Sequence, residues 1–329
     1  MKKYGILLLV TALLMVLIPL PNLAWDRLSI RTPIPENEQA DEFDGETFLV
    51  LDTDSGEVSE WSERDFIIGT VACEMSPSYH EEALKAQAVA AYTYYSVKRA
   101  ATRSASQPNQ SLNGADFADV PTRFPEGYTK DGMKERWGSK SDAYYDKIAA
   151  AVDEVLGQKL YYHNDPICAL YHAISFGTTE TAKNVWGGDD YPYLCSVPSP
   201  GDTTAPKFET TVTVTEKEWK KAVQSLDKDV LLDGKAAKWI GKTTRSKAGT
   251  VLQMVIGDKM FSGTDLRTAF GLRSACFTVE YHDGEFTFTV KGYGHGVGMS
   301  QYGANYLAEQ GADYQEILSF YYTDVEIRI

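Results

Sequence analysis

The sequence contains no run of lysine and arginine residues dense enough to follow a phosphate backbone. Its 32 basic residues are outnumbered by 46 acidic ones, which gives a formal net charge of −14. Nucleic-acid binders carry a positive surface that matches their polyanionic ligand. We therefore expect no nucleic-acid partner, and any polymeric ligand should be held by shape, stacking and hydrogen bonds instead of long-range attraction.

The sequence is also poor in cysteine and lacks the common catalytic signatures. It has no nucleophile elbow, no Ser-His-Asp ordering and no phosphate-binding loop, which argues against esterases and kinases. The cysteines are too few for a disulfide scaffold. In an exported chain they allow up to two disulfides in three alternative pairings, and metal binding is a competing use. They are Cys73, Cys168, Cys195 and Cys276.

The N-terminus has the features of an export signal. Lys2 and Lys3 precede an apolar run over residues 6–20, slightly shorter than the roughly 20 residues that span a membrane. No good cleavage site follows, so we predict a single N-terminal transmembrane anchor over residues 1–25, with a cleaved signal as the alternative. Residues 26–46 are polar, acidic and proline-bearing and predict a stalk. The body would then lie outside the cytoplasm at the cell membrane.

Residues 47–329 predict one α+β domain with mixed sheets and several helices, because helical and strand patterns follow each other without regular βαβ alternation. Residues 104–132 lack periodicity and predict a long loop. We expect strands at 47–52, 208–214, 251–256, 276–281 and 286–291, a hairpin pairing 160–163 with 167–175, helices at 79–101, 141–156, 299–309 and 313–320, and short helices capped by Thr215 and Ser262.

Glu74 is the first candidate for chemistry. It is a lone carboxyl group among apolar residues, just before the predicted helix at 79–101. A carboxyl group in such surroundings loses hydration and can stay protonated long enough to act as a general acid. The alternative is a helix cap or a satisfied polar group.

The second candidate is the stretch 292–303, in which glycines alternate with other residues around His295 before a helix begins. Glycine permits backbone conformations that other residues resist, and free N–H groups at a helix start can hold an oxygen-rich ligand. A dinucleotide fingerprint is excluded by the spacing. The alternative is a tight structural turn.

The third candidate is His163, Cys168 and His172, which fall on the predicted hairpin. Imidazoles and a thiolate are ligands that zinc prefers. The spacing matches no common zinc signature, and ordinary packing is the alternative.

Three blocks of the sequence resemble the stage II sporulation protein D family, in order and over most of the chain after about residue 45. At position 92, where the family usually has arginine, this chain has Tyr92. The blocks are Glu74-Met75 followed by 82–91, Tyr171-His172 with Ser175, Gly177, Thr179-Glu180 and 185–187, and the stretch 294–303.

The resemblance implies a lytic transglycosylase of the engulfment machinery in spore-forming bacteria. It implies an N-terminal membrane helix, peptidoglycan glycan strands as substrate, and a cell-wall amidase and a multi-span membrane protein as partners. Glu74 would be catalytic. Some members hold zinc near the Tyr-His block, which favours a metal at Cys168 and His172, with His163 as a third ligand. Candidates for positioning the sugar are Lys85, Gln87, Tyr171, Ser175, His295 and Gln301.

The expected reaction uses one carboxyl group twice and requires no cofactor. Glu74 would protonate the glycosidic oxygen and then take a proton from the sugar's own C6 hydroxyl, which closes a 1,6-anhydro ring without water. Two other functions compete with this one. The first is a binding protein that modifies an amidase without cutting glycan, and the second is a zinc hydrolase built on His163, Cys168 and His172.

Overall fold

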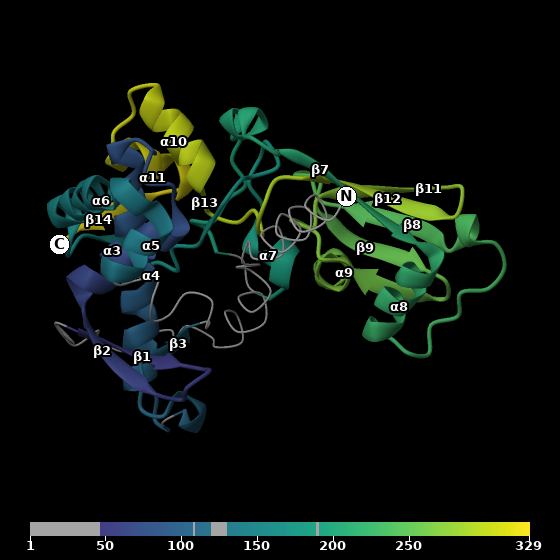
Figure 1. The fold of residues 1–329 in the computed structure, drawn as a ribbon, viewed down its shortest axis with the longest axis horizontal. Coiled ribbons are helices and arrows are strands. Elements are labelled where there is room, and N and C mark those ends of the chain that lie inside the picture. Colours follow the sequence, from purple (N-terminus) through teal and green to yellow (C-terminus); the bar gives the residue numbers. More distant parts are fainter. Residues whose placement is uncertain (1–46, 108, 120–129, 189–190) are drawn as a thin grey trace, which may run out of the picture.

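Two separate hydrophobic clusters organise the computed structural model, which describes residues 47–107, 109–119, 130–188 and 191–329 (Figure 1). The first cluster draws on both the N-terminal and the C-terminal parts of the described chain, and the second on the residues between them. The fold is a mixture of helices and small sheets, which confirms the predicted α+β class. The region predicted as one domain therefore contains two packing units.

The first cluster is built around helix α4, which is buried on most of its surface and lies against α3, α6, α10 and α11. Its many alanines let these neighbours approach closely. The elements that surround or join this cluster are β1 (Thr47–Asp52), β2 (Val58–Ser62), α3 (Glu63–Glu74), α4 (Glu81–Ser104), η1 (Gln110–Leu112), β3 (Phe117–Asp119), α5 (Lys130–Trp137), η2 (Gly138–Lys140), α6 (Ser141–Val155), β4 (Lys159–Tyr162), β5 (Asp165–Pro166), β6 (Tyr171–His172), α7 (Ala182–Trp186), η3 (Pro200–Thr204), β13 (Met299–Ser300), α10 (Gln301–Glu309), α11 (Tyr314–Tyr321) and β14 (Val325–Arg328).

The second cluster packs two three-stranded antiparallel sheets, in the orders β10-β9-β8 and β11-β12-β7, with two helices. Trp219 of α8 stacks on Phe286 of β12, with ring centroids 3.9 Å apart. Its elements are β7 (Glu209–Thr215), α8 (Glu216–Leu226), η4 (Ala236–Lys238), β8 (Ile240–Arg245), β9 (Val251–Ile256), β10 (Lys259–Ser262), α9 (Gly263–Phe270), β11 (Phe277–His282) and β12 (Glu285–Lys291).

Several predicted elements are confirmed. The strand bounds 47–52 and 251–256 match β1 and β9, and the helices at 141–156 and 313–320 are found as α6 and α11 within one residue at each end. The hairpin turn between β11 and β12 is also confirmed. Asp283 and Gly284 have φ of 48° and 92°, the left-handed backbone that a two-residue hairpin turn requires.

Other predictions were wrong. Helix α3 was missed because residues 66–72 are all buried, and a helix buried on every side shows no polar and apolar alternation. Helix α4 begins after His80, whose Nδ1 accepts from the Glu82 N–H, and not after Ser78. The predicted return strand at 167–175 is reduced to β6 (Tyr171–His172), which pairs with β13 and not with β4. β4 instead pairs with the two-residue β5 and with β14.

The glycine-rich stretch brings distant parts of the chain together. β13 pairs in parallel with β6, so Met299 lies beside Tyr171 and Ser300 beside His172. Gly298, just before β13, has φ of 72°, and a Cβ atom added there would overlap the Leu170 carbonyl oxygen. This position therefore requires glycine.

The predicted anchor at 1–25 and stalk at 26–46 lie outside the described residues. Among the residues that the structure does describe, none of the helices is both long enough and apolar enough to cross a membrane.

Candidate functional site

Glu74 is the last residue of helix α3 and is half-buried in the wall of a pocket of about 450 Å³. The pocket lies between the turn that follows α3 and the α5–α6 region. Its lining residues are Cys73, Glu74, Met75, Ser76, Pro77, Ser78, Arg136, Trp137 and Tyr144.

Gln301, the first residue of α10, holds the Glu74 carboxyl group. Its Nε2 donates to Glu74 Oε2 at 3.1 Å and lies 3.3 Å from Gln87 Oε1 on helix α4. Gln301 and Gln87 are 5% and 0% exposed. The structure thus brings three predicted site residues together. Gln301 contacts the carboxyl group and Gln87 contacts Gln301, but neither glutamine lines the pocket.

A second residue of α10 fixes the turn that carries Glu74. Asn305 lies one helical turn after Gln301, on the same face, and its Oδ1 accepts from the His80 N–H at 2.7 Å. On the other side of the turn, Lys147 of α6 donates to the Pro77 carbonyl oxygen at 3.2 Å and to that of Tyr79. Helices α10 and α6 therefore hold the link between α3 and α4 from two sides.

Lys85, a predicted sugar-positioning residue, lies in an ion-pair cluster away from the residues that line this pocket. Its ammonium group is within 3.2 Å of Glu81 and Glu82 on its own helix and contacts Glu154 on α6. Burial lowers the pKa of Lys85, but these hydrogen bonds outweigh burial and raise it above its usual value. The arrangement joins α4 to α6.

Tyr92 is likewise remote from the residues that line the pocket. Its hydroxyl group donates to Glu63 at 2.9 Å, and Arg99, two turns further along α4, donates to the other oxygen of that carboxylate at 2.6 Å. Tyr92 therefore contributes to a contact between α4 and the start of α3.

Ser175 is fully buried and its hydroxyl group donates to Asp202 at 2.5 Å. Ser300 donates to the other oxygen of the same carboxylate at 2.7 Å. Asp202 is 0% exposed and joins the Tyr-His block to the glycine-rich block from within. Tyr171 is also buried, on strand β6. Neither Ser175 nor Tyr171 lines the Glu74 pocket.

His295 and His172 lie side by side in the interior, with ring centroids 5.7 Å apart, and Trp186 packs on His295 at 5.0 Å. The Val297 N–H donates to His295 Nδ1 at 3.0 Å, and His172 Nδ1 is 3.1 Å from the Val297 carbonyl oxygen. Burial lowers the pKa of both imidazoles, that of His172 to about 4, and the positive charge of a protonated His172 would lower the pKa of His295 further. Both side chains are therefore neutral near pH 7 and buried away from the residues that line the Glu74 pocket.

The predicted zinc ligands are not gathered into a metal site. Within the described ranges, no three His, Cys, Asp or Glu side chains are arranged to hold a metal ion. The His163 ring packs at a tilt against Tyr162 with centroids 4.2 Å apart, and burial raises the pKa of the Cys168 thiol to about 12. His172 faces His295, as described above. A zinc ligand set of His163, Cys168 and His172 does not fit this arrangement, so no chemical step is assigned to a metal.

The pocket wall formed by Arg136, Trp137 and Tyr144 was not predicted from the sequence. Arg136, Trp137 and Tyr144 come from α5 and α6, and the first two fall next to a stretch without hydrophobic periodicity that was assigned to a loop. The available signal was the pair Arg136-Trp137 itself, a cation beside a large aromatic residue in an otherwise polar segment.

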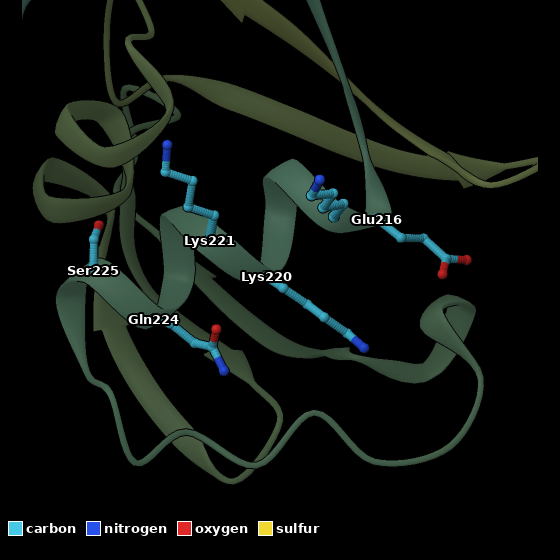
Figure 2. Close-up of a pocket in the computed structure, with 6 residues that line it drawn as sticks. Glu216, Lys220, Lys221, Gln224 and Ser225 are labelled. Carbon is cyan, nitrogen blue, oxygen red and sulfur yellow. The ribbon is translucent and has the colours of Figure 1, made fainter.

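A larger pocket lies on the surface of helix α8, lined by Glu216, Lys217, Lys220, Lys221, Gln224 and Ser225. Figure 2 shows that the labelled side chains project in different directions and do not converge on one point. Lys220 lies over the Trp239 ring at 4.9 Å, and Glu216 accepts from the Tyr281 hydroxyl group. None of the predicted site residues is found there, so the smaller Glu74 pocket is the better candidate for chemistry.

Comparisons with known proteins connect this chain to one family. A family profile described as stage II sporulation protein matches residues 52–162, the range that carries every lining residue of the Glu74 pocket. Stage II sporulation protein D of Bacillus amyloliquefaciens is 40% identical over 266 residues, which are 80% of this chain and 73% of that protein. The protein of the same name from Bacillus subtilis (strain 168) is 37% identical over 264 residues, again 80% and 73% of the two chains.

A more distant relative has a different name. The amidase enhancer of Bacillus subtilis (strain 168) is 28% identical over 308 residues, which are 77% of this chain and 39% of that protein.

Proposed function

The chain belongs to the stage II sporulation protein D family, and from this premise we propose that it is a peptidoglycan lytic transglycosylase. It would cleave the bond between N-acetylmuramic acid and N-acetylglucosamine in glycan strands whose peptides have been removed, and leave 1,6-anhydro ends. The proposed setting is the removal of septal wall during engulfment in sporulation. The family membership rests on the two relatives that share 37–40% identity over most of both chains.

The observation that supports this reaction is the single carboxyl group of the pocket. Among the described residues that line it, Glu74 is the only acid. Hydrolytic glycosidases generally need two carboxyl groups, about 5 to 9.5 Å apart, one of them to activate water or attack the sugar. A transglycosylase needs one, because the sugar supplies its own nucleophile. One well-held glutamate facing a pocket therefore favours ring closure over hydrolysis.

In the proposed mechanism, protonated Glu74 first donates to the glycosidic oxygen as positive charge grows at the anomeric carbon. The bond to the leaving sugar breaks, and the carboxylate that remains takes the proton of the C6 hydroxyl group as its oxygen bonds to that carbon. Gln301 keeps one carboxyl oxygen in place through both steps. The proton returns to Glu74, so the enzyme is ready for another cycle and water is not consumed.

The test is the mass of the product made from peptide-stripped strands. The wild-type chain should release products lighter than hydrolytic ones by one water. Glu74→Gln keeps the shape of the side chain and the acceptor for Gln301 but cannot donate a proton, so it should fold normally and release no anhydro product. Wild-type turnover by this variant would refute the assignment.

A second candidate function follows from the relative named amidase enhancer. In that case the pocket would bind glycan, and the chain would stimulate a cell-wall amidase without cutting the strand. The discriminating outcome is a wild-type chain that yields no anhydro product, together with a Glu74→Gln variant that stimulates the amidase as well as wild type does.

The remaining parts of the proposal concern location and partners. We propose that residues 1–25 anchor the protein in the cell membrane, with the described body outside the cytoplasm. The amidase that strips the peptides and a multi-span membrane protein are the proposed partners. Digestion of intact cells by an external protease should remove the body, and a chain lacking residues 1–25 should leave the membrane fraction.

A further inference from the structure

The pocket wall that faces Glu74 combines one cation with two aromatic rings. Arg136 and Trp137 end helix α5, and Tyr144 lies in the first turn of α6. None of the three belongs to the segments expected to position a sugar. Their placement opposite a proposed proton donor raises the question of which ligand this combination of groups would recognise.

The two rings form a fixed aromatic edge. Trp137 and Tyr144 pack in a T shape, with centroids 5.7 Å apart and planes at 88°, and both are half-buried. Edge-to-face packing restrains the orientation of each ring. A restrained, half-exposed indole presents an apolar surface of the size of a sugar ring.

Arg136 differs from three other arginines of this acidic chain. Arg64, Arg99 and Arg103 each donate to a carboxylate of another segment of the chain. Arg136 is exposed, and the contact described for it is a hydrogen bond from Nη1 to the Ala72 carbonyl oxygen at 3.3 Å. Across the parts of the chain that the structure describes, no acidic side chain pairs with it. This bond secures one edge of the guanidinium group two residues before Glu74 and leaves other N–H groups for a ligand.

We propose that Arg136 binds a free carboxylate carried by the sugar ring that packs on Trp137. A guanidinium group pairs with a carboxylate through two parallel hydrogen bonds, which fixes orientation as well as position. N-acetylmuramic acid carries such a carboxylate on its lactyl group only after its peptide has been removed, because the peptide is joined through that group as an amide. Arg136 would thus make the pocket selective for peptide-stripped strands. This inference rests on the proposed function.

The experiment measures binding of two oligosaccharides by the full chain carrying Glu74→Gln, which prevents turnover. One ligand is a short N-acetylglucosamine and N-acetylmuramic acid oligomer with free lactyl carboxylates, and the other is the same oligomer with these groups converted to carboxamides. Titration calorimetry should give an affinity about tenfold higher for the acid form, as expected for a charge-assisted pair in a half-enclosed site.

Adding Arg136→Gln should abolish this preference, by weakening the acid form about tenfold while changing the amide form less than about twofold. Lys134→Gln is the matched control, because it removes the same charge from the same exposed helix and pairs only weakly, with Asp131 at 3.5 Å. This control should keep the preference. Trp137→Ala should weaken both ligands alike.

Two results would overturn the inference. If Arg136→Gln left the preference intact, or weakened both ligands equally, the carboxylate is recognised elsewhere while the proposed function stands. If the Glu74→Gln chain bound neither oligomer, the proposed function would fail together with the inference.

Discussion

The side-chain amide of Gln301 donates a hydrogen bond to the carboxyl group of Glu74 across 227 positions of the sequence. It joins the start of α10 to the end of α3. The same amide also donates to the side-chain oxygen of Gln87 on α4. Because both glutamines are buried, the carboxyl group has a rigid polar support on its inner side. A proton donor held in this way is preorganised for transfer to a bound substrate.

Removing this support should slow catalysis and leave substrate binding intact. We expect Gln301→Ala to lower kcat about 10- to 100-fold, since hydrogen bonds to charged groups contribute about 1.5–3 kcal/mol. KM should change less than about twofold, because Gln301 does not line the pocket. Gln310→Ala, at the exposed end of the same helix, is the control and should behave as wild type. An unchanged kcat in the Gln301 variant would contradict the positioning role.

Lys85 should matter for stability more than for turnover. Replacing it by methionine removes the cation shared by Glu81, Glu82 and Glu154 and leaves those carboxylates to repel each other. We expect the free energy of unfolding to fall by about 1 kcal/mol, a modest value because two of the partners are half-exposed or more. Urea unfolding measures it, and kcat per folded molecule should stay within about twofold. A large rise in KM at unchanged stability would instead support the sugar-positioning role predicted from the sequence.

The buried Asp202 carboxylate should be a strong structural determinant. Asp202→Asn replaces one of its two acceptor oxygens by a donor, so either Ser175 or Ser300 loses its partner in the interior. We expect a loss of about 2–3 kcal/mol, and of about 1–2 kcal/mol for Ser175→Ala. Chemical denaturation gives both values. The contrary result is a Ser175→Ala chain of wild-type stability whose KM for glycan strands has risen.

Gly298→Ala should disrupt the pairing of β13 with β6. The new methyl group would overlap the Leu170 carbonyl oxygen in addition to straining a backbone with φ of 72°. We expect destabilisation of about 3 kcal/mol or more. Gly271→Ala isolates the strain, because Gly271 has φ of 62° and open space around it, and should cost about 1 kcal/mol. Equal thermal stability of the two variants would show that the close approach at Gly298 is relieved by a small shift.

Local signals in the sequence were sufficient to predict elements that have one buried face and one exposed face. Strand β12 alternates buried and exposed residues, and its hairpin turn carries Asp283-Gly284, so both were predicted. Helix α3 was not, because its middle is buried on all sides and resembles any short apolar run. The residue at its end, Glu74, was nevertheless predicted as a site residue, since an isolated acid in an apolar segment is visible without knowledge of the helix.

The roles of the other site residues could not be predicted from spacing. Gln301 and Gln87 were expected to contact sugar, and the structure instead places Gln301 against the carboxyl group and Gln87 against Gln301. Ser175 was expected at the site, and it is fully buried against Asp202. In each case the residue belongs to one of the three sequence blocks that resemble the family. The direction of its side chain, however, depends on packing between segments far apart in sequence. Arg136 and Trp137 were missed because they follow a stretch without hydrophobic periodicity that was assigned to a loop.

The second cluster is joined to the first through two neighbouring strands. β7 and β12 are antiparallel partners, and just beyond them the Gly292 N–H donates to the Phe208 carbonyl oxygen at 2.7 Å. The chain therefore leaves the first cluster before β7 and returns to it after β12 at adjacent positions, as it does in a domain inserted into another domain. Exchange or enlargement of the segment between β7 and β12 would keep the ends of this segment adjacent. Glu74 and the residues around it belong to the first cluster and would not be changed. Related chains can in this way acquire a new accessory surface without rebuilding the pocket.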